Sequence, residues 1–143
     1  MGQVNAVAEL AAPPERVWAE FSNPRNFEHW LTIHSKWKGE VPAEFSKGAQ
    51  ATQVVTMLGM PNTITWTVDE YDAPNRLVIS GVGMAGVKCT FTLSVEPEGS
   101  GSKASIAAGF EGQMIVGAMG KAVEKDAKKQ LDDSLGKFAV LVG

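Results

Sequence analysis

Residues 112–142 read GQMIVGAMGKAVEKDAKKQLDDSLGKFAVLV, and this stretch decides the fold. Apolar or small side chains recur along it at steps of three or four residues, which is the period of one helix face. This face carries Met119, Val123, Ala127, Leu131, Ser134, Phe138 and Leu141. The opposite side carries Lys121, Lys125, Lys128, Lys129 and Asp132. The pattern predicts one amphipathic helix of about eight turns, roughly 45 Å long.

Upstream of this helix, residues 35–110 alternate between apolar and polar side chains in short runs broken by Gly, Pro and Asn. A period of two is typical of half-buried strands. We expect strands near 35–41, 49–58, 62–72, 76–83, 86–96 and 102–110. Their connections are too short for parallel crossovers, so neighbouring strands must be antiparallel.

The run that begins at Val87 shows the expected register most clearly. Alternation predicts that one set of side chains points to the interior: Val87, Cys89, Phe91, Leu93 and Val95. The intervening side chains should point to solvent: Lys88, Thr90, Thr92 and Ser94.

The first thirty residues add one strand and two short helices. Residues 3–10 alternate like a strand, and Pro13 and Pro14 suit the start of a helix. Asn23 and Pro24 are typical of an N-cap and first residue for a second short helix. The resulting order predicts an α+β fold in which a curved, seven-stranded antiparallel sheet surrounds the C-terminal helix. Because one helix is only about 10 Å wide, we expect the curled sheet to leave an enclosed cavity beside it.

Size and charge narrow the possible functions. The chain has 143 residues, which suits a single domain spanning 1–143. A net charge of -3 gives no electrostatic footprint for a phosphate backbone, so we expect no nucleic-acid partner. No window approaches 18 uncharged apolar residues and no secretory signal is evident, so we expect no membrane span and a cytoplasmic location.

Four stretches carry a resemblance to a known superfamily. They read AAPPERVW at 11–18, EHWLTIH at 28–34, ITWTVDEYDAPNRL at 64–77 and GFEG at 109–112. With the order of elements, they resemble the START-like (SRPBCC) superfamily, which includes polyketide cyclases, plant pathogenesis-related proteins and lipid-transfer domains. They are similar to a largely actinobacterial subgroup, whose members are uncharacterised or cyclase-like and sometimes the toxin half of a two-gene module. The resemblance implies the helix-grip fold but not one function, because the superfamily hosts both binding proteins and enzymes.

The sequence contains no recognisable catalytic or metal-binding motif. His29 and His34 lack the spacing of a helical zinc pair, and no Gly-x-Ser-x-Gly motif occurs. Cys89 lies in an apolar run and is expected to be a buried core residue. We therefore expect no metal and no cofactor.

The leading hypothesis is that the cavity binds a small hydrophobic molecule of lipid, polyketide or aromatic type. The candidate wall residues are Trp30, Val55, Met57, Trp66, Phe91, Phe110, Met119 and Val123. Gln130 and Ser134 are candidate polar anchors, because a polar group near the apolar face needs a water, backbone or ligand partner. Two alternatives stay open. One is a cyclase- or dehydratase-like enzyme with an ionisable group in the cavity, and the other is a toxin-like protein that interacts with a small antitoxin.

Overall fold

A computed structural model describes residues 2–83, 86–112 and 116–142. Its sheet has seven antiparallel strands in the spatial order β1-β7-β6-β5-β4-β3-β2. The strands are β1 (Gly2–Leu10), β2 (His34–Lys38), β3 (Gln50–Met57), β4 (Met60–Asp72), β5 (Arg76–Val82), β6 (Lys88–Glu98) and β7 (Gly101–Glu111). Every neighbouring pair after β2 is joined in hairpin fashion, while β1 closes against β7 at the other edge. The predicted antiparallel sheet is confirmed.

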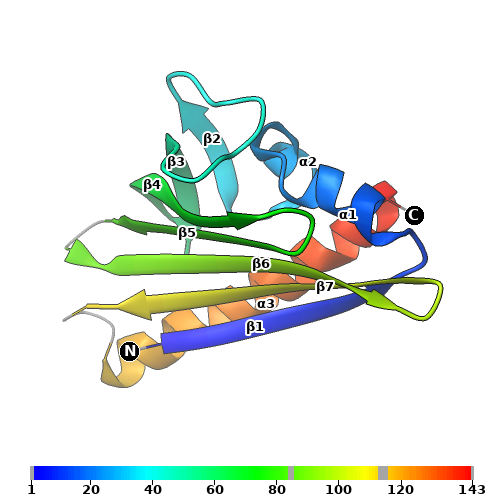
Figure 1. The fold of residues 1–143 in the computed structure, drawn as a ribbon. Coiled ribbons are helices and arrows are strands. Elements are labelled where there is room, and N and C mark those ends of the chain that lie inside the picture. Colours follow the sequence, from blue (N-terminus) through cyan, green and yellow to red (C-terminus); the bar gives the residue numbers. More distant parts are fainter. Residues whose placement is uncertain (1, 84–85, 113–115, 143) are drawn as a thin grey trace.

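Helices cover one side of this sheet. They are α1 (Pro14–Phe21), the 3-10 turn η1 (Pro24–Asn26), α2 (Phe27–Trp30) and α3 (Gly117–Val142). The Asn23 side chain accepts a hydrogen bond from the Arg25 backbone N–H at 3.0 Å, which is the predicted N-cap. In Figure 1, α3 runs diagonally along the sheet, and α1 and α2 lie towards its C-terminal end. The sheet and α3 together form the expected helix-grip arrangement.

The long helix begins later than the sequence pattern predicted. Gly112 lies in a bend, and α3 begins at Gly117, whose φ is +56°. A residue in the left-handed region cannot continue a right-handed helix, so α3 starts there. Residues 113–115 of the predicted helix lie outside the described residues. At the other end, Leu141 is exposed and Val142 is buried in its place, because the helical period carries the buried face one residue further on.

Two strand limits also differ from the expectation. The expected strand at 35–41 ends at Lys38, because Gly39 adopts a positive φ of +73°. The connection between the strands expected at 49–58 and 62–72 is shorter: Met57 pairs with Met60, so Leu58 and Gly59 alone form the loop. The register of β6 is confirmed, since Cys89, Phe91, Leu93 and Val95 are buried while Lys88 and Thr90 are exposed.

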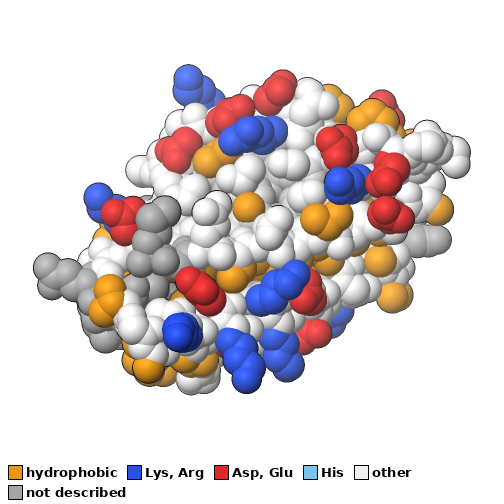
Figure 2. All heavy atoms as spheres, turned by 90° about the horizontal axis from the view of Figure 1, so that it is seen from below, with side chains coloured by type: hydrophobic (Ala, Val, Ile, Leu, Met, Phe, Trp, Pro, Cys, Tyr) orange, Lys and Arg blue, Asp and Glu red, His pale blue; other side chains and the backbone are white. Residues whose placement is uncertain are grey.

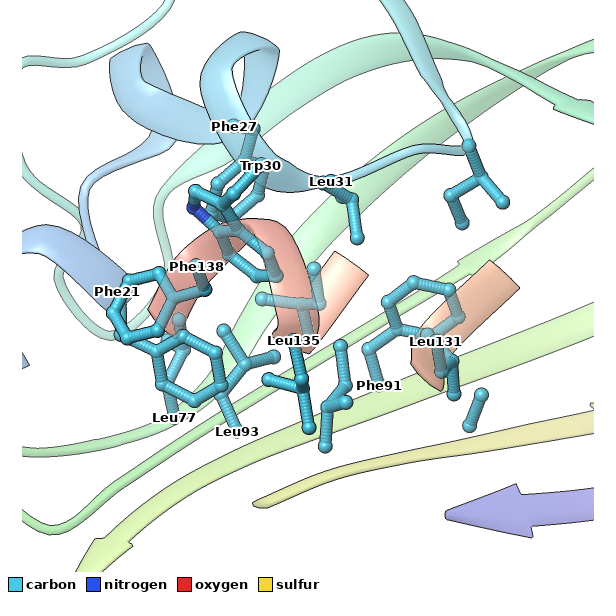
Figure 3. Packing of buried hydrophobic residues seen from close by; sticks show 14 of the residues in the cluster. Phe21, Phe27, Trp30, Leu31, Leu77, Phe91, Leu93, Leu131, Leu135 and Phe138 are labelled. Carbon is cyan, nitrogen blue, oxygen red and sulfur yellow. The ribbon is translucent and has the colours of Figure 1, made fainter. Parts of the chain in front are cut away.

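An aromatic cluster fills the interior at the C-terminal end of α3. Trp30 of α2 packs with its ring centroid 5.1 Å from that of Phe21 in α1 and 5.3 Å from that of Phe138 in α3. Figure 3 shows these rings meeting Leu77 and Leu93 of the sheet, with Leu135 beside them. Aromatic and leucine side chains therefore pack together around the C-terminal end of α3.

The surface is mixed in character. On the face in Figure 2, Lys and Arg side chains are interspersed with Asp and Glu. Exposed ion pairs contribute to this mixture, among them Lys128 with Asp132 at 3.0 Å and Lys103 with Glu96 at 3.5 Å. Across residues 2–83, 86–112 and 116–142, no helix is both long enough and apolar enough to cross a bilayer.

Candidate ligand cavity

A cavity of about 120 Å³ lies between the sheet and the first turns of α3. Strand side chains that alternate onto the concave face form most of its wall, and the helix contributes one face. The cavity is lined by Ile33, Val55, Met57, Leu58, Met60, Asn62, Ile64, Val87, Cys89, Phe91, Phe110, Met119 and Val123. It therefore occupies the end of α3 opposite the aromatic cluster.

The solvent exposure of the lining side chains distinguishes the mouth of the cavity from its floor. Leu58, Met60 and Met119 line the cavity but are 40%, 52% and 43% exposed, so they mark its opening. Phe91 and Phe110 are buried and form the floor, with ring centroids 6.4 Å apart and an interplanar angle of 88°. A molecule that enters would pass the β3–β4 hairpin and the start of α3 before it reached two edge-to-face rings.

The lining is apolar almost throughout. Among the described residues that line the cavity, Asn62 has the one amide side chain and Cys89 the one titratable group. Burial raises the pKa of the Cys89 thiol to about 11, so the thiol is neutral at ordinary pH. Such a wall favours an uncharged guest, because a charged one would lose its hydration without gaining a partner.

The structure brings six of the ten sequence candidates together around this space: Val55, Met57, Phe91, Phe110, Met119 and Val123. Their role in binding stays a prediction. Trp30 lies outside the cavity, within the aromatic cluster. Trp66 does not line the cavity but packs next to it, its ring centroid 5.1 Å from that of Phe91.

Trp66 belongs to a buried polar chain next to the cavity. Its indole Nε1–H donates to Gln53 Oε1 at 2.7 Å, and Gln53 Nε2 lies 2.6 Å from His34 Nδ1. Because an indole N–H only donates, the amide must present its oxygen to Trp66 and its NH₂ to His34. The Nδ1 atom of His34 is therefore the acceptor, so the ring is neutral with its proton on Nε2. Burial also lowers the pKa of His34, against an opposing effect of Glu28.

The two candidate anchors already form hydrogen bonds with other protein groups. Ser134 Oγ accepts from the Thr32 backbone N–H at 2.9 Å and donates to the Gln130 carbonyl oxygen at 2.7 Å. The Gln130 side-chain oxygen accepts from the Thr32 hydroxyl at 2.6 Å. These bonds connect α3 to the segment that follows α2. The hydrogen-bond partners expected for Ser134 and for the Gln130 side-chain oxygen are therefore groups of the protein itself.

A hydrogen bond links the mouth to α3. The Leu58 backbone N–H donates to Asp126 Oδ2 at 3.1 Å. Leu58 and Gly59 both have positive φ, +53° and +75°, which is the backbone of a type I′ hairpin turn. The backbone N–H of the first central residue of such a turn, here Leu58, has no acceptor in the strand ladder. The Asp126 carboxylate provides that acceptor. Asp126 stands seven residues after Met119, so the helical period places it on the cavity side of α3.

Sequence reasoning missed seven lining residues: Ile33, Leu58, Met60, Asn62, Ile64, Val87 and Cys89. Val87 and Cys89 could have been identified from the sequence, because the alternation in this strand already placed their side chains on the inner face. Leu58, Met60 and Asn62 fell in or beside the expected turn, and no local pattern indicates that a hairpin tip bends over a cavity.

The fold and the cavity together define a class of protein: a curved sheet that grips a helix and keeps an apolar space beside it. One solved structure with this fold is a START superfamily protein from Mycobacterium smegmatis. It matches with a TM-score of 0.79 and 16% sequence identity, covering 99% of this chain and 97% of that one. At that identity the likeness establishes the fold alone.

Sequence comparison gives the family. The chain belongs to the polyketide cyclase/dehydrase and lipid transport family, whose model matches residues 1–143. It is 32% identical over 143 residues to the uncharacterized protein Rv1546 of Mycobacterium tuberculosis H37Rv, with each chain covered completely. It is also 30% identical over 141 residues to a protein of the same strain named Toxin Rv0910, covering 99% of this chain and 98% of that one.

Proposed function

We propose that this protein binds a small, uncharged, apolar molecule in the cavity and performs no covalent chemistry on it. The observation that carries the proposal is the composition of the wall: thirteen lining residues from the sheet, the helix and the loops before β2, β4 and β6, none of them charged. Membership of a family described by cyclase, dehydrase and lipid transport functions supports an apolar ligand.

The size of the cavity limits the ligand. A cavity of about 150 Å³ lined by Leu, Ile and Phe stays dry and binds benzene or xenon. At about 120 Å³, the space here suits one ring or a short alkyl chain. A larger ligand would insert one end and leave the rest at the mouth beside Leu58 and Met60.

The enzyme alternative requires an ionisable group that could move a proton inside the cavity. Cys89 is the one such group among the described lining residues, and its raised pKa makes it a poor base at neutral pH. None of the seven residues outside the described set has a titratable side chain. The chemistry of the wall thus favours binding over cyclase or dehydratase catalysis.

The similarity to a protein named as a toxin supports a second candidate, in which this chain acts on a protein partner. The two candidate functions predict different effects of a substitution that fills the cavity. A Met119→Trp variant should lose its ligand in the first case, and a toxic effect on expression should persist in that variant in the second case.

Extraction of freshly purified protein tests the proposal. The extract is analysed by mass spectrometry for a small neutral molecule, with Met119→Trp purified in parallel as the matched control. We expect a compound present in proportion to the unmodified protein and absent from the variant. Identical extracts from both proteins, together with no uptake of added benzene by the unmodified protein, would contradict the proposal.

A further inference from the structure

Sulfur atoms gather at this cavity. The described residues include three methionines, Met57, Met60 and Met119, and one cysteine, Cys89. All four line the cavity, although its wall comprises only about a tenth of the described residues. Met1, Met84 and Met114 lie outside the described residues.

The thioethers surround the path that a guest would take. Met57 and Met60 are cross-strand partners on either side of the hairpin loop, and Met119 faces them from the first turn of α3. Beyond them lie the two perpendicular rings of Phe91 and Phe110. A guest would therefore have polarizable sulfur around its sides and aromatic faces and edges beneath it.

This lining distinguishes aromatic from saturated guests. A thioether sulfur about 5 Å from an aromatic ring makes a favourable contact that an aliphatic ring does not match. Edge-to-face packing of the guest on Phe91 and Phe110 also favours an aromatic guest over a saturated one. Burial of apolar area, in contrast, rewards both kinds of guest alike.

We propose that the cavity selects a guest that presents one uncharged aromatic ring over a saturated guest of equal size. Met57 and Met119 are then specificity-determining residues, because their sulfurs flank the ring from the sheet and from the helix. This inference rests on the proposed binding function, and it adds the chemical class of the ligand.

The test compares toluene with methylcyclohexane, which have the same carbon skeleton. Their dissociation constants are measured for the unmodified protein, for Met57→Leu, for Met119→Leu and for the double variant. Met and Leu have similar volumes, so the folded state should survive these exchanges. Each exchange should weaken toluene binding about two- to tenfold and leave methylcyclohexane binding within about twofold.

The change in the ratio of the two constants is the readout, because differences in hydrophobicity cancel from it. Ile64→Leu is the matched control: it alters the wall without altering sulfur, so it should change both constants alike. Equal losses of both guests in the methionine variants, or no loss of either, would overturn the inference and leave the proposed function standing. Binding of neither guest by the unmodified protein would overturn both.

A second measurement does not depend on any variant. In the unmodified protein with labelled methionine methyl groups, bound toluene should move the Met57 and Met119 methyl signals by its ring current. Methylcyclohexane should move them far less. If toluene binds while these two signals stay in place, the ring does not lie among the thioethers and the inference fails.

Discussion

Raising the pH probes the cavity wall through Cys89. Burial raises the pKa of this thiol from 9.0 to about 11. Because the thiolate fraction falls tenfold for each pH unit below the pKa, the folded protein at pH 8 should hold roughly one hundredth of the thiolate of an exposed cysteine. Only the thiolate reacts readily with iodoacetamide, so alkylation should be slower by at least that factor.

Alkylation is followed by mass spectrometry between pH 8 and pH 11, with protein unfolded in guanidinium chloride as the exposed reference. The rate for the folded protein should rise about tenfold per pH unit up to about pH 11, while the reference levels off near pH 9. A midpoint near 9 for the folded protein would refute a dry environment for Cys89.

The same shift predicts how stability depends on pH. Folding raises the pKa of Cys89, so its contribution is complete below pH 9 and is lost as the pH rises towards 11. The loss should be about 1.4 kcal/mol per pH unit across that window. The difference in unfolding free energy between the unmodified protein and Cys89→Ala isolates this effect from other titrating groups. A difference that stays constant with pH would contradict the assignment.

Three further substitutions test other parts of the account. Met119→Trp should fill the mouth and abolish uptake of apolar molecules, yet destabilise by less than the roughly 1–3 kcal/mol typical of overpacking a filled core, as thermal unfolding would reveal. Gln53→Leu should cost about 1–3 kcal/mol in denaturant unfolding by leaving the Trp66 indole N–H unpaired, and a neutral effect would mean that another acceptor replaces the amide. Asp126→Ala should speed amide hydrogen exchange at Leu58 about tenfold, with Asp133→Ala as the exposed control on α3, and equal rates in both would show that Asp126 does not hold the hairpin.

Regular elements were predictable because their signal is local and repeated. The face of α3 recurs over seven turns, and the alternation in β6 fixes which side chains point inward, so errors were confined to the ends. Gly117 shows why the start of α3 was predicted too early. The apolar pattern of the sequence continues upstream of Gly117, but the positive φ of this residue stops the helix from extending upstream of it. Leu58 shows the same limit for turns, since a Leu-Gly pair lacks the Asn-Gly signature of a type I′ hairpin.

The candidate site was predictable only in part, because a cavity is defined by residues far apart in the chain. Alternation and the helical face identified Val55, Phe91 and Val123, which line it. These patterns could not indicate that the Ser134 hydroxyl bonds to Thr32, 102 residues earlier, and so is not available to a ligand. Nor could they reveal that the bulky Trp30 closes the far end.

Titration with benzene, followed by NMR of labelled methyl groups, tests the central claim most directly. Binding in the cavity predicts saturable shifts at Val55, Met57 and Val123, with little change at Val140, which is exposed far from the mouth near the end of α3. Shifts that never saturate, or that are as large at Val140 as at Val123, would mean that the cavity takes up no apolar guest and would contradict the account.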